Sequence, residues 1–451
     1  VKPEKGSRWI LHFGAVDQCA VVYINGKKQG KHVGGYLPFS YDITEALKEE
    51  KNLLTVKVRD YSETCYYSRG KQKLKNGGMF YTAQSGIWQT VWIEKVPECY
   101  IGHLKITPLY DQSSIMIQME EEHGIKDIDY EVTITARKMW PVKASGKTGK
   151  PCVIMIPHMR SWSPEDPFLY DLHVRMGEDS VESYFAMRKV EVKNDKEGIA
   201  RIFLNNEPYF EKGVLDQGYW PDGLYTPPCD EAMIYDIQKM KDLGFNMIRK
   251  HIKIEPQRWY YHCDRIGMLV WQDMVNGGRE YKSWYVTWLA TAMEGTHIRA
   301  KDTRLHLMGR QDPTGQKQFE SEMKETIRRL YNHPSVVTWV IFNEGWGQFK
   351  TRKMTDIALA EDHTRLIDSA SGWFDQGCGD IKSIHDYFFP LNITPEKRVT
   401  ALTEFGGYSL QIPKHSMYEK DIYGYKIFKR KKDLSRAYEK LIKKLVIPNI
   451  S

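Results

Sequence analysis

Two glutamates stand in similar surroundings in the C-terminal half of the chain. Glu344 follows an apolar run at residues 336–342, and Glu404 ends a shorter apolar segment around Leu402, each just before glycine residues. Two carboxyl groups held about 5–5.5 Å apart can cleave a glycosidic bond with retention of configuration. One, as a carboxylic acid, protonates the leaving oxygen, and the other attacks the anomeric carbon. The pair predicts glycoside hydrolysis, provided that the fold brings the two side chains together.

The elements that must position these glutamates alternate between strand and helix beyond residue 196. Apolar residues recur at helical spacing over residues 231–243, and the run ends at Gly244, a helix stop signal. Such alternation with near-continuous apolar strands indicates a parallel sheet flanked by helices, as in a (β/α)8 barrel. We expect seven strands, near Gly213, Met247, Val270, Trp339, Trp373, His385 and Leu402.

The spacing of the glutamates fits this barrel. Sixty residues separate them (404 − 344), which is room for three βα units and puts them after strands four and seven. Side chains at the carboxyl ends of barrel strands share one mouth. No eighth strand is evident, so either the chain is truncated or its last strand is supplied in an unusual way. An open barrel could misplace a glutamate, which leaves a carbohydrate-binding fragment without turnover as an alternative.

The residues before the barrel have the pattern of β-structure. Residues 21–24 run into Asn25-Gly26, a strong hairpin dipeptide, and residues 53–58 alternate with period two. We predict one β-sandwich over residues 1–97, a second over residues 98–193 and the barrel over residues 194–451.

Several motifs resemble those of a known family. Asn343-Glu344 after strand four and the segment 403–407, Thr-Glu-Phe-Gly-Gly, after strand seven resemble the retaining glycosidases of the (β/α)8 clan. Residues 30–44 and 85–92 resemble the sugar-binding jelly-roll domain of glycoside hydrolase family 2, and the turn at residues 162–165 resembles its immunoglobulin-like middle domain. The resemblance covers nearly the whole chain. It implies a retaining β-glycosidase with Glu344 as the acid/base and Glu404 as the nucleophile.

The resemblance also implies side chains that hold the sugar. Asn343 would hydrogen-bond the sugar 2-hydroxyl, and Arg249, after strand two, would lie near Glu404 and keep that carboxylate ionised. A salt bridge that supports the barrel is nearly the same interpretation of Arg249. His251 falls one residue earlier than the family's histidine, so its contact with the sugar is an open question.

Further candidates for sugar binding end strands or carry a flat ring. Asp216 ends the first strand, and Asp273 and His385 end the third and sixth, so all three face the same mouth. Trp220 and Trp346 offer faces on which a sugar could stack. The alternatives are a helix cap or loop role for Asp216, plain packing for the tryptophans, and no substrate contact for Asp273 and His385.

Composition narrows the class of protein. The 451 residues include 13 Trp, 27 Tyr and 16 Phe, a richness that suits carbohydrate binding and equally suits large β-rich cores. The formal charge of +7 is spread over 65 basic and 58 acidic residues. The one dense basic cluster, residues 426–432, is interpreted as a solvated face, so we expect no nucleic-acid partner.

Signals of other protein classes are missing from the sequence. It contains no nucleotide-binding loop, no serine-hydrolase elbow and no H-E-x-x-H pair, so we expect neither a cofactor nor a metal site. No apolar run approaches the ~20 residues of a membrane span. Seven scattered cysteines without a C-x-x-C pair favour a reducing, cytoplasmic compartment. Secretion is the alternative, because no signal peptide is visible but Val1 opens the chain abruptly. Homo-oligomers could form through edge strands of the first sandwich.

Taken with the resemblance, these patterns predict an exo-acting retaining β-glycosidase, β-galactosidase-like, that cleaves an oligosaccharide or glycoside through a covalent glycosyl-enzyme. Nothing downstream of Glu404 supplies the Asn-x-Lys clamp of family 2 β-glucuronidases, which favours a neutral sugar. The alternative is the same mechanism on a β-glucuronide, galacturonide, mannoside or arabinoside.

Overall fold

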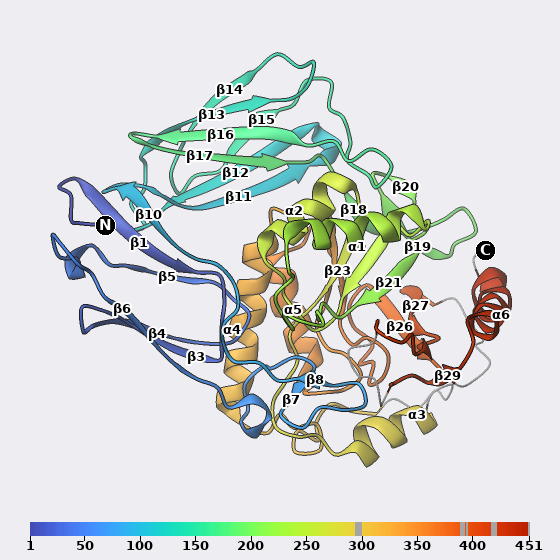
Figure 1. The fold of residues 1–451 in the computed structure, drawn as a ribbon. Coiled ribbons are helices and arrows are strands. Elements are labelled where there is room, and N and C mark those ends of the chain that lie inside the picture. Colours follow the sequence, from blue (N-terminus) through green and yellow to red (C-terminus); the bar gives the residue numbers. More distant parts are fainter. Residues whose placement is uncertain (294–299, 388–392, 394–395, 416–421, 450–451) are drawn as a thin grey trace.

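The computed structural model describes residues 1–293, 300–387, 393, 396–415 and 422–449. Two β-rich regions and an α/β barrel make up the molecule (Figure 1). The first region lies at the left beside helix α4 (Pro313–Leu330), and the second lies at the top, above the barrel. This architecture confirms the predicted combination of β-sandwiches and a (β/α)8-type barrel.

The first region consists of two antiparallel sheets around a common core of Leu11, Phe13 and Val22. One sheet has the order β10 (Val91–Pro97), β1 (Ser7–Phe13), β5 (Phe39–Asp42), and the other β4 (Lys27–Val33), β3 (Cys19–Ile24), β6 (Leu54–Arg59). Short strands β2 (Val16–Asp17) and β9 (Gly86–Ile87) pair at the side. The predicted hairpin at Asn25-Gly26 joins β3 to β4, and both residues have the positive φ that a tight primed turn requires.

The second region is also a pair of antiparallel sheets. Their orders are β11 (Ile101–Leu109), β12 (Ser114–Glu121), β15 (Cys152–Met155), and β14 (Val142–Lys147), β13 (Asp129–Thr135), β16 (Tyr170–Met176), β17 (Asp179–Phe185). Side chains of β16 alternate between buried and exposed, as expected for a sheet with one face on the core. Ile117, Tyr130 and Leu172 fill the space between the sheets.

The described residues of the barrel form seven parallel strands. Five form one sheet, namely β21 (Gly213–Asp216), β22 (Met247–Lys250), β23 (Leu269–Asp273), β24 (Val336–Val340) and β25 (Leu366–Asp368), and β26 (Ile381–Asp386) pairs with β27 (Val399–Phe405). Helices α1 (Asp230–Asp242), α2 (Gln257–Ile266), α4 and α5 (Thr351–Glu361) connect the first five strands. The fifth strand was expected near Trp373, and this placement was wrong. The fully buried Leu366–Asp368 pairs with β24, whereas Trp373 lies in the loop that follows.

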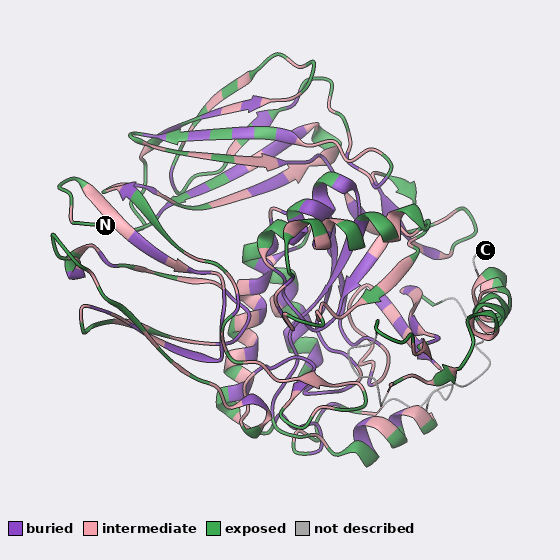
Figure 2. Cartoon of the chain, viewed as in Figure 1, coloured by how far each residue is buried: buried purple, intermediate pink, exposed green. Residues whose placement is uncertain are grey.

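The two sides of the barrel differ in closure. Strands β23 and β24 are buried at every residue, but most of β21 and β27 is only half buried (Figure 2). Within the described residues, no strand pairs with the outer edge of β21 or with the free edge of β27. Instead β28 (Tyr408–Leu410) and β29 (Lys426–Phe428) pair with each other in parallel, and helix α6 (Lys431–Leu441) follows.

The amino ends of the barrel strands rest on a small sheet of β18 (Val190–Asn194), β19 (Ala200–Leu204) and β20 (Glu207–Pro208). Val190 and Ile202 pack there with Leu269 and Val337. The division predicted between residues 193 and 194 therefore falls inside strand β18, where β18 and β19 form one antiparallel pair.

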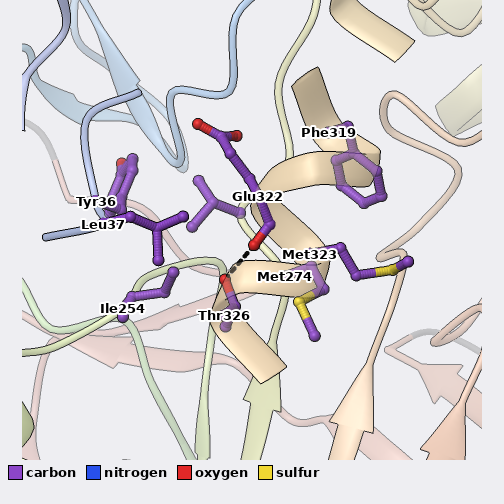
Figure 3. Close-up of a pocket in the computed structure, with 9 residues that line it drawn as sticks. Tyr36, Leu37, Ile254, Met274, Phe319, Glu322, Met323 and Thr326 are labelled. Atoms are coloured by element: carbon purple, nitrogen blue, oxygen red, sulfur yellow. Dashed lines mark hydrogen bonds between the residues drawn. The ribbon is translucent and has the colours of Figure 1, made fainter. Parts of the chain in front are cut away.

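The first region also contacts the barrel directly. Its Tyr36 and Leu37 meet α4 and the loops after β22 and β23 around a small cavity, lined further by Ile254, Met274, Phe319, Glu322, Met323 and Thr326 (Figure 3). Short strands β7 (Gln72–Lys73) and β8 (Tyr81–Thr82) carry a further segment of the first region across the barrel mouth (Figure 1), where Ser68 bridges to Gly277. The helices of the described residues include none with both the length and the apolar character needed to cross a membrane.

Candidate active site

The two glutamates meet at the carboxyl ends of the barrel strands. Glu404 lies in β27, and Glu344 follows β24 by four residues. One carboxylate oxygen of each and a ring nitrogen of His385 all lie within 4.8 Å of one another. This spacing is close to the separation at which one carboxylate can attack a sugar while the other delivers a proton.

Glu404 sits in a buried, positively charged environment. Its side chain is only 6% exposed, and Arg249 Nη1 donates to its Oε1 at 2.9 Å. Tyr387 donates its hydroxyl to Oε2 at 2.5 Å, and His385 Nε2 lies 3.6 Å from Oε1. Burial opposes ionisation of Glu404, but the charges of His385 and Arg249 outweigh it and lower the pKa to about 2. The carboxylate is therefore ionised at neutral pH, as a nucleophile must be.

Arg249 donates hydrogen bonds to three other side chains of the site. Its Nε and Nη2 donate to the two carboxylate oxygens of Asp273 at 2.9 and 3.0 Å, and Nη2 also donates to Asn343 Oδ1 at 2.9 Å. A bidentate pair of this kind fixes the plane of the guanidinium. Asn343 keeps its oxygen on Arg249, so its amide nitrogen, which has no hydrogen bond in the described residues, is left to face a ligand.

Glu344 occupies a different environment on the other side of the pair. Its side chain is 14% exposed, and His385 Nδ1 lies 2.9 Å from its Oε1. Glu344 has a φ of 50°, in the left-handed region that a non-glycine residue adopts only when its surroundings impose it. The next residue must be glycine, because a Cβ on Gly345 would lie 2.5 Å from the Phe374 ring. Buried Phe342, stacked on Phe319, anchors the start of this loop.

His385 lies between the two carboxylates and is fully buried. Burial disfavours its protonation, but the negative charges of Glu404 and Glu344 raise its pKa above the usual value. Ser371 Oγ is 3.0 Å from Nε2, and a Cβ on Gly372 would strike the imidazole ring. The ring is thus held by packing and by its three polar neighbours.

Asp273 and His251, two further candidates for sugar binding, are buried beside Arg249. Both oxygens of Asp273 are taken by Arg249. His251 is 1% exposed, and its Nδ1 is 2.8 Å from Asp273 Oδ2, at an angle too poor for a hydrogen bond. Burial lowers the pKa of His251 well below its usual value, so the ring is neutral.

The structure places the remaining candidates outside this network. Asp216 accepts from Lys250 Nζ at 2.6 Å and from the backbone of Gly218. Lys250 also pairs with Glu255, so Asp216, whose side chain is 32% exposed, belongs to an ion cluster with these two buried residues. Trp346 is 5% exposed and packs against Phe80 and Tyr281, while Trp220 packs on the barrel core. Plain packing explains both tryptophans.

Two residues of the site were not predicted from the sequence. Tyr387, stacked on Tyr425 at 3.7 Å, stands two residues after His385, and this strand-end position was a usable signal. Lys71, of the first region, is among the positive groups that lower the pKa of Glu404, and nothing in its local sequence indicates this effect. The cluster of Glu344, His385 and Glu404 could also hold a metal ion by ligand type and distance. Within this cluster His385 is hydrogen-bonded to Glu344.

Known families match most of the chain in three consecutive segments. Residues 3–97 match the sugar binding domain of glycosyl hydrolases family 2, residues 99–188 match a further segment of glycosyl hydrolases family 2, and residues 228–403 match its TIM barrel domain.

Individual relatives are distant and longer. The β-galactosidase of Thermoanaerobacter pseudethanolicus is 24% identical over 440 residues, which are 90% of this chain and 52% of that protein. A Formosa agariphila relative is 24% identical over 360 residues, 76% of this chain and 38% of its own length. The structure of a β-D-glucuronidase of Dictyoglomus thermophilum superposes with a TM-score of 0.71 at 19% identity, covering 94% of this chain and 76% of that one. The chain thus spans about half or less of these two curated relatives.

Proposed function

Because the chain belongs to glycosyl hydrolase family 2, we propose that it is a retaining, exo-acting β-glycosidase. The single observation that supports this most strongly is the pair of carboxylates, one ionised and buried beside Arg249, the other more exposed beside His385. Among its relatives, one is named a β-galactosidase and one solved structure is named a β-glucuronidase.

In the first step, the Glu404 carboxylate attacks the anomeric carbon as the glycosidic bond breaks. Glu344 gives its proton to the leaving oxygen, so the aglycone departs as an alcohol and the sugar stays as an ester on Glu404. In the second step, Glu344, now a carboxylate, removes a proton from water, and the resulting hydroxide equivalent displaces Glu404. The product is the free sugar with its β configuration retained, and both glutamates return to their starting states.

The neighbouring side chains have defined parts in this proposal. Arg249 keeps Glu404 ionised and aims Asn343, whose free amide nitrogen would bind the sugar 2-hydroxyl and strengthen that contact in the transition state. The first region's segment across the mouth, with Ser68 bridged to Gly277, closes one side of the site. A site closed on one side suits the end of a sugar chain, which supports exo action.

A panel of 4-nitrophenyl β-glycosides tests the proposal. We expect the purified protein to release 4-nitrophenol from at least one of the galactoside, glucuronide, galacturonide, glucoside, mannoside and arabinoside, with a product of retained configuration by NMR. An inverted product would contradict the carboxylate roles. Silence across the panel from folded protein that still binds sugar would support a binding protein without turnover.

A further inference from the structure

Lys71 differs from the other buried cations of the molecule. Among the described residues, the buried lysines and arginines other than Lys71 each have a carboxylate or carbonyl partner: Arg69, Arg188, Arg249, Lys250, Lys253, Arg310 and Arg365. Lys71 is 7% exposed, and its ammonium has no hydrogen bond or salt bridge in the described part of the chain. The side chain is buried along most of its length and no carboxylate of the described residues pairs with its ammonium, so the ammonium is available to a ligand that brings a counter-charge.

Contacts of the neighbouring residues place Lys71 over the mouth of the barrel. The adjacent Gly70 lies against the loop after β22, because a Cβ there would be 3.1 Å from the Ile252 carbonyl. On one side Ser68 bridges to Gly277, beyond β23. On the other side the Lys71 carbonyl accepts from Tyr81, whose ring stacks on Tyr219, beyond β21, at 3.9 Å. Lys71 thus stands before the end of β22, the strand that carries Arg249 and leads to His251.

The charge of Lys71 reaches the catalytic pair. It is among the positive groups that lower the pKa of Glu404 against the effect of burial, after His385, Arg249 and His251. After burial itself, it is also the largest influence that lowers the pKa of His251. His251 Nε2 is buried and has no hydrogen-bond partner in the described residues, so a second unused polar atom lies in the same part of the site.

We propose that Lys71 binds the carboxylate of an acidic sugar, so that this enzyme removes terminal β-linked uronic acids rather than neutral sugars. This inference rests on the proposed function. An ammonium–carboxylate hydrogen bond is among the stronger polar contacts available to a sugar. The proposal replaces the expectation of a neutral glycon, which depended on a missing clamp downstream of Glu404. Here the cation comes from the first region instead.

The test compares uronides with neutral sugars of the same configuration. The wild-type protein is assayed on 4-nitrophenyl β-D-glucuronide against the β-D-glucoside, and on the β-D-galacturonide against the β-D-galactoside. We expect the uronide of one pair to be preferred. Lys71→Met should lower kcat/KM for that uronide by about 10- to 100-fold more than for the neutral partner, so the ratio of the two should fall by that factor. The ratio of the two rates does not depend on the fraction of folded enzyme.

Two further variants and a binding measurement complete the design. Lys71→Arg should restore part of the uronide preference, and Lys75→Met, an exposed lysine of the same segment, should leave the ratio unchanged. Preference for the neutral sugar, or an equal loss on both substrates in Lys71→Met, would overturn the inference while leaving the glycosidase proposal intact. If nothing is hydrolysed, the glycosidase proposal fails. Calorimetric binding of D-glucuronate and D-galacturonate, weaker in Lys71→Met than in the wild type, would then uphold the inference, and equal or absent binding would overturn it.

Discussion

The surroundings of Glu404 and of Glu344 are two regions of one site with opposite character. Glu404 is almost fully buried and bonded to Arg249 and Tyr387. Glu344 is more exposed, and His385 is its one salt-bridge partner among the described residues. Both glutamates end apolar strands in glycine-containing sequence, so their sequences do not separate their roles. Their environments do separate these roles, because a carboxylate surrounded by cations stays ionised, whereas a carboxylate near solvent can exchange a proton.

The largest expected effect comes from removing the buried carboxylate. Glu404→Gln should lower kcat by about 10⁴-fold or more, because no ester with the sugar can form, while sugar binding by calorimetry persists. Glu165→Gln, at an exposed position, is the control. A Glu404→Gln enzyme that kept a tenth of the wild-type activity would contradict the assignment of different roles to Glu404 and Glu344.

Glu344→Ala should depend on the leaving group. For glycosides with poor leaving groups the loss should be about 10²- to 10⁴-fold, the usual contribution of a general acid. For 2,4-dinitrophenyl glycosides the first step needs no proton, so added azide should restore turnover and give a β-glycosyl azide. Equal losses on all leaving groups, without azide rescue, would mean that Glu344 is not the acid.

Arg249→Met should have a smaller effect that grows at low pH. Loss of a charge-assisted hydrogen bond predicts a decrease in kcat/KM of about 10- to 100-fold at pH 7. Without this charge, burial raises the pKa of Glu404, so the acidic limb of the pH–kcat/KM profile should move to higher pH. An unchanged acidic limb would show that Arg249 does not control Glu404. Arg160→Met, which removes an exposed salt bridge with Asp166, is the matched control.

The smallest of these effects is expected for His385→Asn. The imidazole lies between both carboxylates, and its loss should lower kcat/KM by about 10-fold through one hydrogen bond. Its charge also lowers the pKa of Glu404, so the acidic limb should again move upward. A purely structural role would reduce the folded fraction and leave the pH profile in place.

Much of this site follows from local sequence patterns. Strand β24 is apolar except for Thr338, and its position after a long helix indicates that Asn343 and Glu344 follow a strand end. The pattern around Glu404 is weaker, because β27 carries threonines among its apolar residues and is mostly half buried. These signals are local, because a buried parallel strand must be apolar along its length.

Contacts between distant segments were not predictable in this way. Arg249 and Glu404 are 155 residues apart in the sequence. The sequence also could not show that both carboxylate oxygens of Asp273 accept hydrogen bonds from Arg249. The weak fifth strand, three residues long, was misplaced because the nearby Trp373 gave a stronger apolar signal. Lys71 was missed because it arrives from another region of the fold.

Trapping the covalent intermediate tests most directly whether Glu404 is the nucleophile and Glu344 the acid/base. The protein would be incubated with the 2-deoxy-2-fluoro β-glycosyl fluoride of its best glycon, digested with pepsin and analysed by mass spectrometry. We expect one added fluorosugar per chain, on the peptide that contains Glu404. Label on the Glu344 peptide, or an active enzyme that never becomes labelled, would contradict it.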